Sequence, residues 1–208
     1  MLEILTGTGL ASAAGLNAYI PLLTVGILAR FTDLLPLGEA WQWLEHPAAL
    51  GVIGVLLMLE LAADKIPFVD SVNDIVQTVV RPSSGGVNFG AGVSSTGAAE
   101  FAAAAGGPSG GDSGAGWWPI AAGVLIALVF HLLKAAARPV LNAATFGAGG
   151  PLVSVAEDGA SVLTALAAVL VPVLAAAAAV LLAAVGVWAA RRRRYRRRAA
   201  AAAPPGVY

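Results

Sequence analysis

Long apolar stretches alternate with short polar segments along this chain and predict membrane-spanning helices. A bilayer core of about 30 Å is crossed by roughly 20 helical residues. Residues 8–30, 47–64, 117–137 and 159–190 are apolar stretches of about that length or longer. The last would form a helix of about 48 Å at 1.5 Å per residue. We therefore expect it to tilt, to kink at Pro172 or to project beyond the membrane.

The segment 68–80 has a different pattern, that of an amphipathic helix. Its polar side chains recur at i, i+3, i+4 and i+7 and share one face, while mainly valine and isoleucine cover the rest. These polar residues are Asp70, Asn73, Asp74 and Gln77. Arg81 precedes Pro82, and the residue before a proline is disfavoured in a helix, so we expect the helix to end there. We interpret the segment as an amphipathic or re-entrant helix.

Residues 86–106 are rich in glycine, alanine and serine and are less hydrophobic than the other stretches. Gly86 and Gly90 have the spacing that lets a second helix approach closely, so we interpret this segment as a buried span. The Gly/Ser-rich residues 107–116 have the composition of a flexible linker. Together these patterns predict an all-α fold, a polytopic membrane helix bundle of about five spans over residues 1–190.

The chain also repeats itself, without a gap, at an offset of 57 residues. Eight of the 23 positions in 78–100 are identical to their counterparts in 135–157. The most specific matches are Arg81 with Arg138, Phe89 with Phe146, and Glu100 with Glu157. Duplicated bundles with polar residues at the repeat interface are a common plan of small transporters. We predict two parallel repeat units, about 61–106 and 118–163.

The same offset places acidic residues of one unit opposite basic residues of the other. His131, Lys134 and Arg138 lie at i, i+3 and i+7, on one helical face, and symmetric packing would bring Asp70 and Asp74 towards them. Charged groups within membrane helices are costly and mark either a pathway or a pair. If they form a pair, Asp74 with Lys134 would be a structural ion pair that fixes the register of the two helices. The histidine would be either a satisfied core residue or a proton carrier.

Two further features have both a structural and a functional interpretation. Ser154 and Glu157 have the spacing of a capping box before the last apolar run, but Glu100 repeats the acid where Gly97 provides no cap. Two segments should break or loosen their helices, the glycine-rich residues 147–151 and the segment around Asn17. Each break would either be a simple kink or expose backbone polar groups. Membranes tolerate exposed backbone only where protein or a water-filled cavity satisfies it, and helix N-termini at such breaks attract anions.

The polar residues in or beside the predicted helices form one candidate set, a polar pathway or a set of ion pairs. They are Asn17, Glu60, Asp64, Lys65, Asp70, Asp74, Arg81, Glu100, His131, Lys134, Arg138, Glu157 and Asp158.

Composition supports the membrane interpretation, and charge orients the chain. The chain is 58% apolar and only 12% charged, with a mean hydropathy of +0.81, whereas soluble domains average about 25% charged residues. Residues 1–190 hold twelve acidic and five basic residues, a net charge of −7, and the tail 191–208 holds seven arginines. The positive-inside rule predicts a cytoplasmic tail. Arg191–Arg198 would then contact anionic lipid headgroups rather than nucleic acid.

Several classes of chemistry are excluded or unsupported. The chain has no cysteine, which excludes disulfides, zinc–thiolate sites and iron–sulfur clusters. Its two histidines, His46 and His131, are far apart, so we expect no histidine metal site. Neither a phosphate-binding loop nor a Ser-His-Asp set is present in the sequence. We therefore expect the protein not to be an enzyme and to bind no cofactor. No basic residue precedes Arg30, so we expect the first segment to be a retained span rather than a signal peptide.

Several segments together resemble one bacterial family of small integral-membrane proteins, known only as a domain of unknown function. They are Gly15-Leu-Asn-Ala-Tyr-Ile-Pro-Leu-Leu, Glu60-x-x-x-Asp-Lys-Ile-Pro-x-x-Asp70, Arg81-Pro82, His131-x-x-Lys-x-x-x-Arg138 and Gly150-Pro-Leu-Val-Ser-Val-Ala-Glu-Asp158. The resemblance covers about residues 5–185 and implies an integral membrane protein, with no activity attached. The alanine-rich, lysine-poor composition indicates a bacterial genome, and we expect the bacterial inner membrane as location.

Two functions fit these patterns best. One is a small-solute or ion transporter, in which the candidate residues line a polar path that alternates between the repeats. The other is a non-transporting membrane scaffold or assembly partner, in which the same residues are paired and the Gly/Ala faces bind other helices, including those of a second copy. An enzyme acting on lipid has the weakest support, because no nucleophile–base set stands out.

Overall fold

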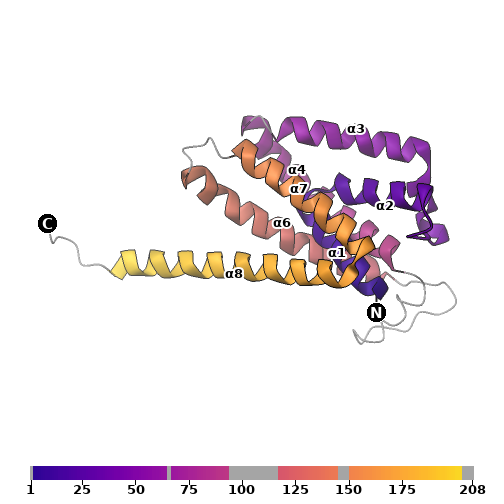
Figure 1. Cartoon of the computed structure of the whole chain (residues 1–208). Coiled ribbons are helices and arrows are strands. Elements are labelled where there is room, and N and C mark those ends of the chain that lie inside the picture. Colours follow the sequence, from indigo (N-terminus) through magenta and orange to yellow (C-terminus); the bar gives the residue numbers. More distant parts are fainter. Residues whose placement is uncertain (1, 65–66, 94–116, 145–149, 203–208) are drawn as a thin grey trace.

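The computed structural model describes residues 2–64, 67–93, 117–144 and 150–202, and within these ranges every regular element is a helix (Figure 1). The predicted all-α fold is therefore confirmed. The helices are α1 (Leu2–Leu16), α2 (Tyr19–Phe31), the 3₁₀ helix η1 (Glu39–Glu45), α3 (Pro47–Ala63), α4 (Pro67–Gly92), α6 (Trp118–Ala144), α7 (Gly150–Leu170) and α8 (Pro172–Ala202).

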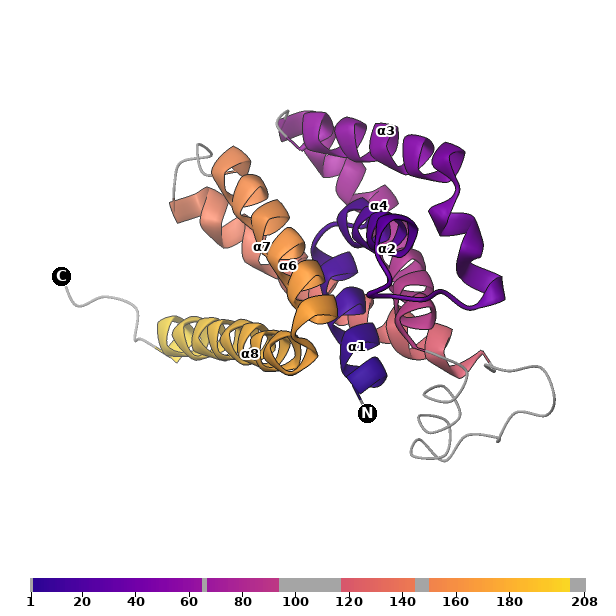
Figure 2. The ribbon, with the colours of Figure 1, turned by 45° about the vertical axis from the view of Figure 1, so that its right-hand side comes forward.

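The path of the chain alternates across the bundle. α1 runs from the N-terminus into the centre, and α2 runs back towards the same end (Figure 1). From α3 onward, successive long helices run in opposite directions, and α8 extends beyond the others (Figures 1 and 2). α1 is the central helix, since Gly9 to Gly15 are all buried. Its apolar packing partners come mainly from α4, α6 and α7.

The first predicted span, 8–30, is wrong as a single helix, because the chain breaks between α1 and α2. The side-chain Oδ1 of Asn17 accepts hydrogen bonds from the backbone N–H groups of Tyr19, at 3.0 Å, and Ile20, at 3.2 Å. This is the bonding of a helix N-cap, and it satisfies N–H groups that have no partner at a helix start. The break therefore makes a helical hairpin of α1 and α2, with Asn17 at its tip.

The amphipathic helix was predicted to end at Arg81, and that boundary is wrong, because α4 continues through Pro82 to Gly92. A proline inside a helix removes one hydrogen bond and is disfavoured locally. Tertiary packing outweighs this cost, since the turn after Pro82 is pressed against α6. A Cβ atom on Gly85 would lie 2.6 Å from the carbonyl oxygen of Gly123 in α6, so no larger residue fits at this contact.

The glycine spacing predicted to allow close helix approach is used inside the chain. Gly86 and Gly90 are both buried. A Cβ on Gly86 would meet the side chain of Ile120 in α6, and one on Gly90 would meet Trp41 in η1. The C-terminal half of α4 is thus a close-packing surface on which η1 and α6 rest.

The last predicted apolar stretch, 159–190, is divided at Pro172, as one of the three expectations stated. Val171 lies outside any helix, and Pro172 begins α8, a position that suits proline because the first helical N–H has no partner. The predicted tail does not begin a new element, because α8 continues helically through its arginines to Ala202.

Two helical segments in the described part of the chain are long and apolar enough to cross a membrane: Trp118–Ala137 and Leu152–Leu170. A third crossing is present if η1 and α3, which meet at a bend of 65°, count as one span. The chain thus has the apolar helices of a membrane-associated protein. The predicted span 86–106 is described only up to Val93, and the linker 107–116 lies outside the described residues.

The two Arg–Pro pairs of the internal repeat lie inside two long helices that pack against each other, Arg81-Pro82 in α4 and Arg138-Pro139 in α6. These helices are antiparallel, because Thr78 of α4 contacts His131 whereas Gly85 faces Gly123. The two parallel repeat units expected from the sequence stay a prediction.

Candidate functional site

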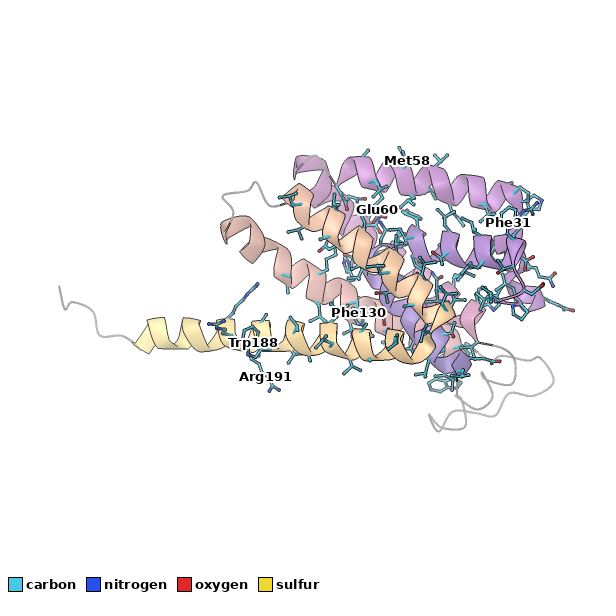
Figure 3. The ribbon with its side chains drawn as sticks, viewed as in Figure 1. Phe31, Met58, Glu60, Phe130, Trp188 and Arg191 are labelled. Atoms are coloured by element: carbon cyan, nitrogen blue, oxygen red, sulfur yellow. The ribbon has the colours of Figure 1, made fainter. Side chains whose placement is uncertain are left out.

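Buried charged and polar side chains from four helices meet around the tip of the α1–α2 hairpin, where Asn17 lies. Glu60 and Asp64 come from the end of α3, Arg81 from the middle of α4, and Lys134 from α6; each is at most 5% exposed. Figure 3 shows Glu60 on the inner side of α3, whereas Met58, two residues earlier, points outwards. We call the described members of this set the polar cluster. They are Asn17, Glu60, Asp64, Gln77, Arg81, His131, Lys134, Ser154, Glu157 and Asp158.

The most deeply buried ion pair joins α3 to α4. Arg81 Nη2 donates to Glu60 Oε1 at 3.0 Å, and the two side chains are 0% and 1% exposed. Arg81 Nη1 lies 3.5 Å from Nδ1 of His131, and the other ring nitrogen of His131 lies 3.1 Å from the hydroxyl of Thr78. Removing charges from water is expensive unless each is paired. This pair, with its histidine neighbour, therefore fixes three helices relative to one another.

A second ion pair joins α6 to α7 and reaches the hairpin tip. Lys134 Nζ lies 2.8 Å from Glu157 Oε2 and donates to the backbone carbonyl of Leu16 at 3.1 Å. Leu16 is the last residue of α1, where helix carbonyls have no partner and carry partial negative charge. Lys134 thus satisfies both a carboxylate and a helix C-terminus.

The two remaining carboxylates of the cluster accept hydrogen bonds from neutral side chains. Asn17 Nδ2 donates to Asp158 Oδ1 at 2.9 Å, so this one side chain caps α2 and binds α7. Asp64 accepts from Asn73 Nδ2 at 3.0 Å and from Ser154 Oγ at 2.9 Å. The end of α3 and the start of α7 are therefore held together, although they are 90 residues apart in the sequence.

The capping-box interpretation of Ser154 and Glu157 is wrong. α7 begins at Gly150, so Ser154 lies inside the helix rather than at its N-cap. Its hydroxyl is bound to Asp64, and Glu157 lies in the ion pair with Lys134. Both side chains serve contacts between helices.

The structure brings seven of the candidate residues from the sequence together. They are Asn17, Glu60, Asp64, Arg81, Lys134, Glu157 and Asp158, joined by the contacts above, with the eighth, His131, beside Arg81. Lys65 and Glu100, and the side chains of Asp70, Asp74 and Arg138, lie outside what the structure describes. The expected contacts of Asp70 and Asp74 with His131 and Lys134 stay predictions.

Four participating side chains were not selected as site residues from the sequence. Ser154 was interpreted as a cap, and Asn73, Gln77 and Thr78 were seen only as part of an amphipathic helix. The signal for Gln77 and Thr78 is their position, four and three residues before Arg81, which places all three on adjoining faces of one helix. The backbone carbonyl of Leu16 carries no sequence signal, because it becomes available only through the break at Asn17.

Some polar atoms of the cluster have no hydrogen-bond partner among the described residues. They are Glu60 Oε2, Arg81 Nε and Gln77 Oε1, all in side chains that are almost fully buried. The phenol of Tyr19 interacts electrostatically with all three of these residues. An unsatisfied buried polar atom costs about 1–3 kcal/mol, so the cluster retains capacity to hydrogen-bond water or a small polar solute. Among the described residues, no group of three or more His, Asp or Glu side chains could hold a metal ion.

Comparisons with known proteins identify the family and go no further. No curated protein and no solved structure matches the chain. One family model, described as a domain of unknown function (DUF4126), matches residues 4–192 of the 208. That match covers all the described helices except the first two residues of α1 and the end of α8, and it includes every member of the polar cluster. The chain therefore belongs to the DUF4126 family, a domain of unknown function.

Proposed function

We propose that this protein is a small-solute or ion transporter of the bacterial inner membrane, with the polar cluster as its binding site. The observation that carries the proposal is the break at Asn17, which places two helix ends within a set of buried charges. Transporters commonly bind their substrates at such discontinuous helices, because helix termini supply polar groups inside the membrane. Irregular backbone is tolerated there only where protein or a water-filled cavity satisfies it.

Each helix end at the break has a specific partner in the cluster. Lys134 binds the C-terminal carbonyl of α1, and Asn17 binds the first N–H groups of α2. Both partners also contact carboxylates on α7, Glu157 and Asp158 respectively. A change in the protonation or ligation of these carboxylates would therefore act directly on the hairpin tip. This coupling is what a transport cycle requires of a central site.

The path of the helices supports a topology of five crossings with a re-entrant hairpin. α3, α4, α6, α7 and α8 would cross, and α1 with α2 would enter and leave on one side. This set differs from the one expected from the sequence, but the number of crossings is the same. With the arginine-rich end of α8 cytoplasmic, the N-terminus would be outside, and Asp64 would lie towards the cytoplasm rather than the outer side.

The antiparallel arrangement of α4 and α6 supports an alternating mechanism between two related halves. We propose that the halves are the repeat units found in the sequence, in inverted orientation.

The arginine-rich end of α8 contacts the end of the bundle. Arg193 donates to the carbonyl of Ala136 in α6 at 2.7 Å, and the Arg192 guanidinium lies 5.1 Å from the ring centre of Trp188. The rest of Arg191–Arg198 would contact anionic headgroups.

A non-transporting scaffold is the alternative, and one observation favours it. The two ion pairs are direct, at 3.0 Å and 2.8 Å, and directly paired charges can hold helices in register with no further role. In that case the cluster would be dry and would keep one geometry under all conditions.

Thiol labelling separates the two functions, because the chain contains no native cysteine. Lys134→Cys and Glu157→Cys would be placed singly in oriented membrane vesicles and treated with a membrane-impermeant thiol reagent from each side. Ala165→Cys, at a fully buried apolar position on α7, is the unreactive control. Labelling that depends on the side, on pH or on an added solute supports transport. Protection of both positions under all conditions contradicts it and favours the scaffold.

A further inference from the structure

α2 leaves an apolar groove on the surface of the bundle. With 13 residues, α2 is about 20 Å long at 1.5 Å per residue. It lies between α3 and α7, which diverge on either side of it (Figures 1 and 2). The groove above it has a volume of about 270 Å³ and is lined by one face of α2, by Leu57 of α3, and by Val162 and Leu166 of α7.

The lining of this groove is apolar except at one residue. Thr24 is its one hydroxyl-bearing residue, and that hydroxyl already donates to the carbonyl of Ile20 at 2.9 Å. The groove walls are also accessible, since Ile27 is 45% exposed and Leu166 is 37% exposed. An occupant must therefore be apolar along the whole length of α2.

A positive charge lies just beyond the groove lining, which ends on α2 at Leu28. Arg30 follows Ile27 by three residues and so lies near the same face of α2. It is exposed, and its contacts are a hydrogen bond of 3.0 Å from Nη1 to the carbonyl of Glu45 and the ring of Phe31. Among residues 1–64 it is the one basic side chain. The same end holds η1 with Trp41 and Trp43, and tryptophans concentrate where the bilayer meets water.

We propose that this groove binds one acyl chain of an anionic phospholipid whose phosphate is held by Arg30. The apolar groove leads towards a cation at the level of the tryptophans. A lipid has the same arrangement, with its chain in the bilayer and its headgroup at the interface. Guanidinium pairs strongly with phosphate. The groove is too small for a helix of another protein, and it opens directly to the surface that lipid would cover. The bound chain fills the space beside the half-length helix and supports the hairpin.

The site does not depend on transport, and it has a direct test. The protein would be washed in mild detergent, mixed with phosphatidylglycerol or phosphatidylcholine, and analysed by native mass spectrometry. We expect one retained phosphatidylglycerol and at least tenfold weaker retention of phosphatidylcholine. Arg30→Gln should lower phosphatidylglycerol retention at least fivefold, whereas Gln42→Ala, an exposed η1 position that does not line the groove, should leave it unchanged.

The acyl-chain part is tested by filling the groove. Leu166→Trp should abolish the retained lipid, and Val162→Trp is a second variant in case the first does not fold. Leu163→Trp is the matched control, because Leu163 lies on the same helix, is 70% exposed and does not line the groove. Retention unaffected by Arg30→Gln and by the groove-filling variants would overturn the proposal. Loss with Arg30→Gln alone, reproduced by competing inorganic phosphate, would mean headgroup binding only and would also overturn it.

Discussion

Pro82 divides α4 into an N-terminal half that ends at Arg81 and a C-terminal half, and the two halves contact the bundle in opposite ways. The N-terminal half presents Thr78 and Arg81 to α3 and α6 through an ion pair and hydrogen bonds. Gln77 Oε1 and Arg81 Nε have no hydrogen-bond partner among the described residues. The C-terminal half presents glycines to α1, α6 and η1 at distances that allow no side chain. Close-packed contacts have one geometry, since almost any added volume is resisted. Polar contacts can exchange partners. One helix thus joins a fixed region to one whose contacts can change.

The largest effect is expected in the fixed half. Gly85→Leu would place side-chain atoms where the carbonyl of Gly123 lies, 2.6 Å from the first added carbon. Overpacking costs about 1–3 kcal/mol where the neighbours can move, but here a backbone carbonyl blocks the added side chain. We therefore expect the largest cost of the four changes, with loss of the folded protein in detergent. Gly54→Leu is the control, because a Cβ there meets nothing within 4 Å. Thermal unfolding followed by size-exclusion chromatography would measure both; equal stability would refute the close contact.

The buried ion pair should give the next largest effect. Arg81→Met removes the partner of Glu60 and leaves a buried carboxylate uncompensated, which costs about 3–5 kcal/mol. The double variant Glu60→Leu with Arg81→Met should recover most of that stability, because both charges are then absent. If the double variant is as unstable as the single one, the two side chains do not act as a pair.

The second pair should matter less, because its carboxylate is less deeply buried. Lys134→Met leaves Glu157, whose side chain is 15% exposed, and the Leu16 carbonyl without this donor. We expect a loss of about 1–3 kcal/mol of stability. The exposed neighbour Leu132→Met should change nothing. A loss of stability as large as that of Arg81→Met would mean that the two ion pairs are equally shielded from water.

The smallest effect concerns a single hydrogen bond whose donor is a neutral hydroxyl. Ser154→Ala removes the hydroxyl that donates to Asp64, and we expect a loss of about 1 kcal/mol in the free energy of unfolding. Ser83→Ala is matched to it, since the Ser83 hydroxyl is exposed and bonds only within its own helix, to Val79. Equal effects of the two changes would show that the contact between α3 and α7 adds no stability.

Hydrophobic pattern predicted the class of fold and most apolar helices. The range 47–64 corresponds to α3, 117–137 to the candidate span in α6, and Pro172 to the start of α8. These follow from length and apolarity, which a single segment carries by itself. The polar candidates were also predictable, because a charge in an apolar helix is rare and conspicuous.

The two wrong boundaries depend on contacts that no local pattern contains. The chain breaks at Asn17 because its side chain caps α2 while Lys134, more than 100 residues later, satisfies the end of α1. α4 continues through Pro82 because the next turn is held by Gly123 of α6. The partners of Glu157 and Ser154 were missed for the same reason, since the capping pattern used only neighbours in sequence.

Solvent access to the two halves of α4 tests the central claim most directly. Gln77→Cys and Ala91→Cys would replace residues that are 1% and 5% exposed, and both would be treated with a small water-soluble thiol reagent in membrane vesicles. A transporter with a hydrated central site predicts that the cysteine at position 77 reacts and that the one at 91, in the close-packed half, does not. Protection of both cysteines at every pH and with every added solute would contradict the account and leave the polar cluster as a structural brace.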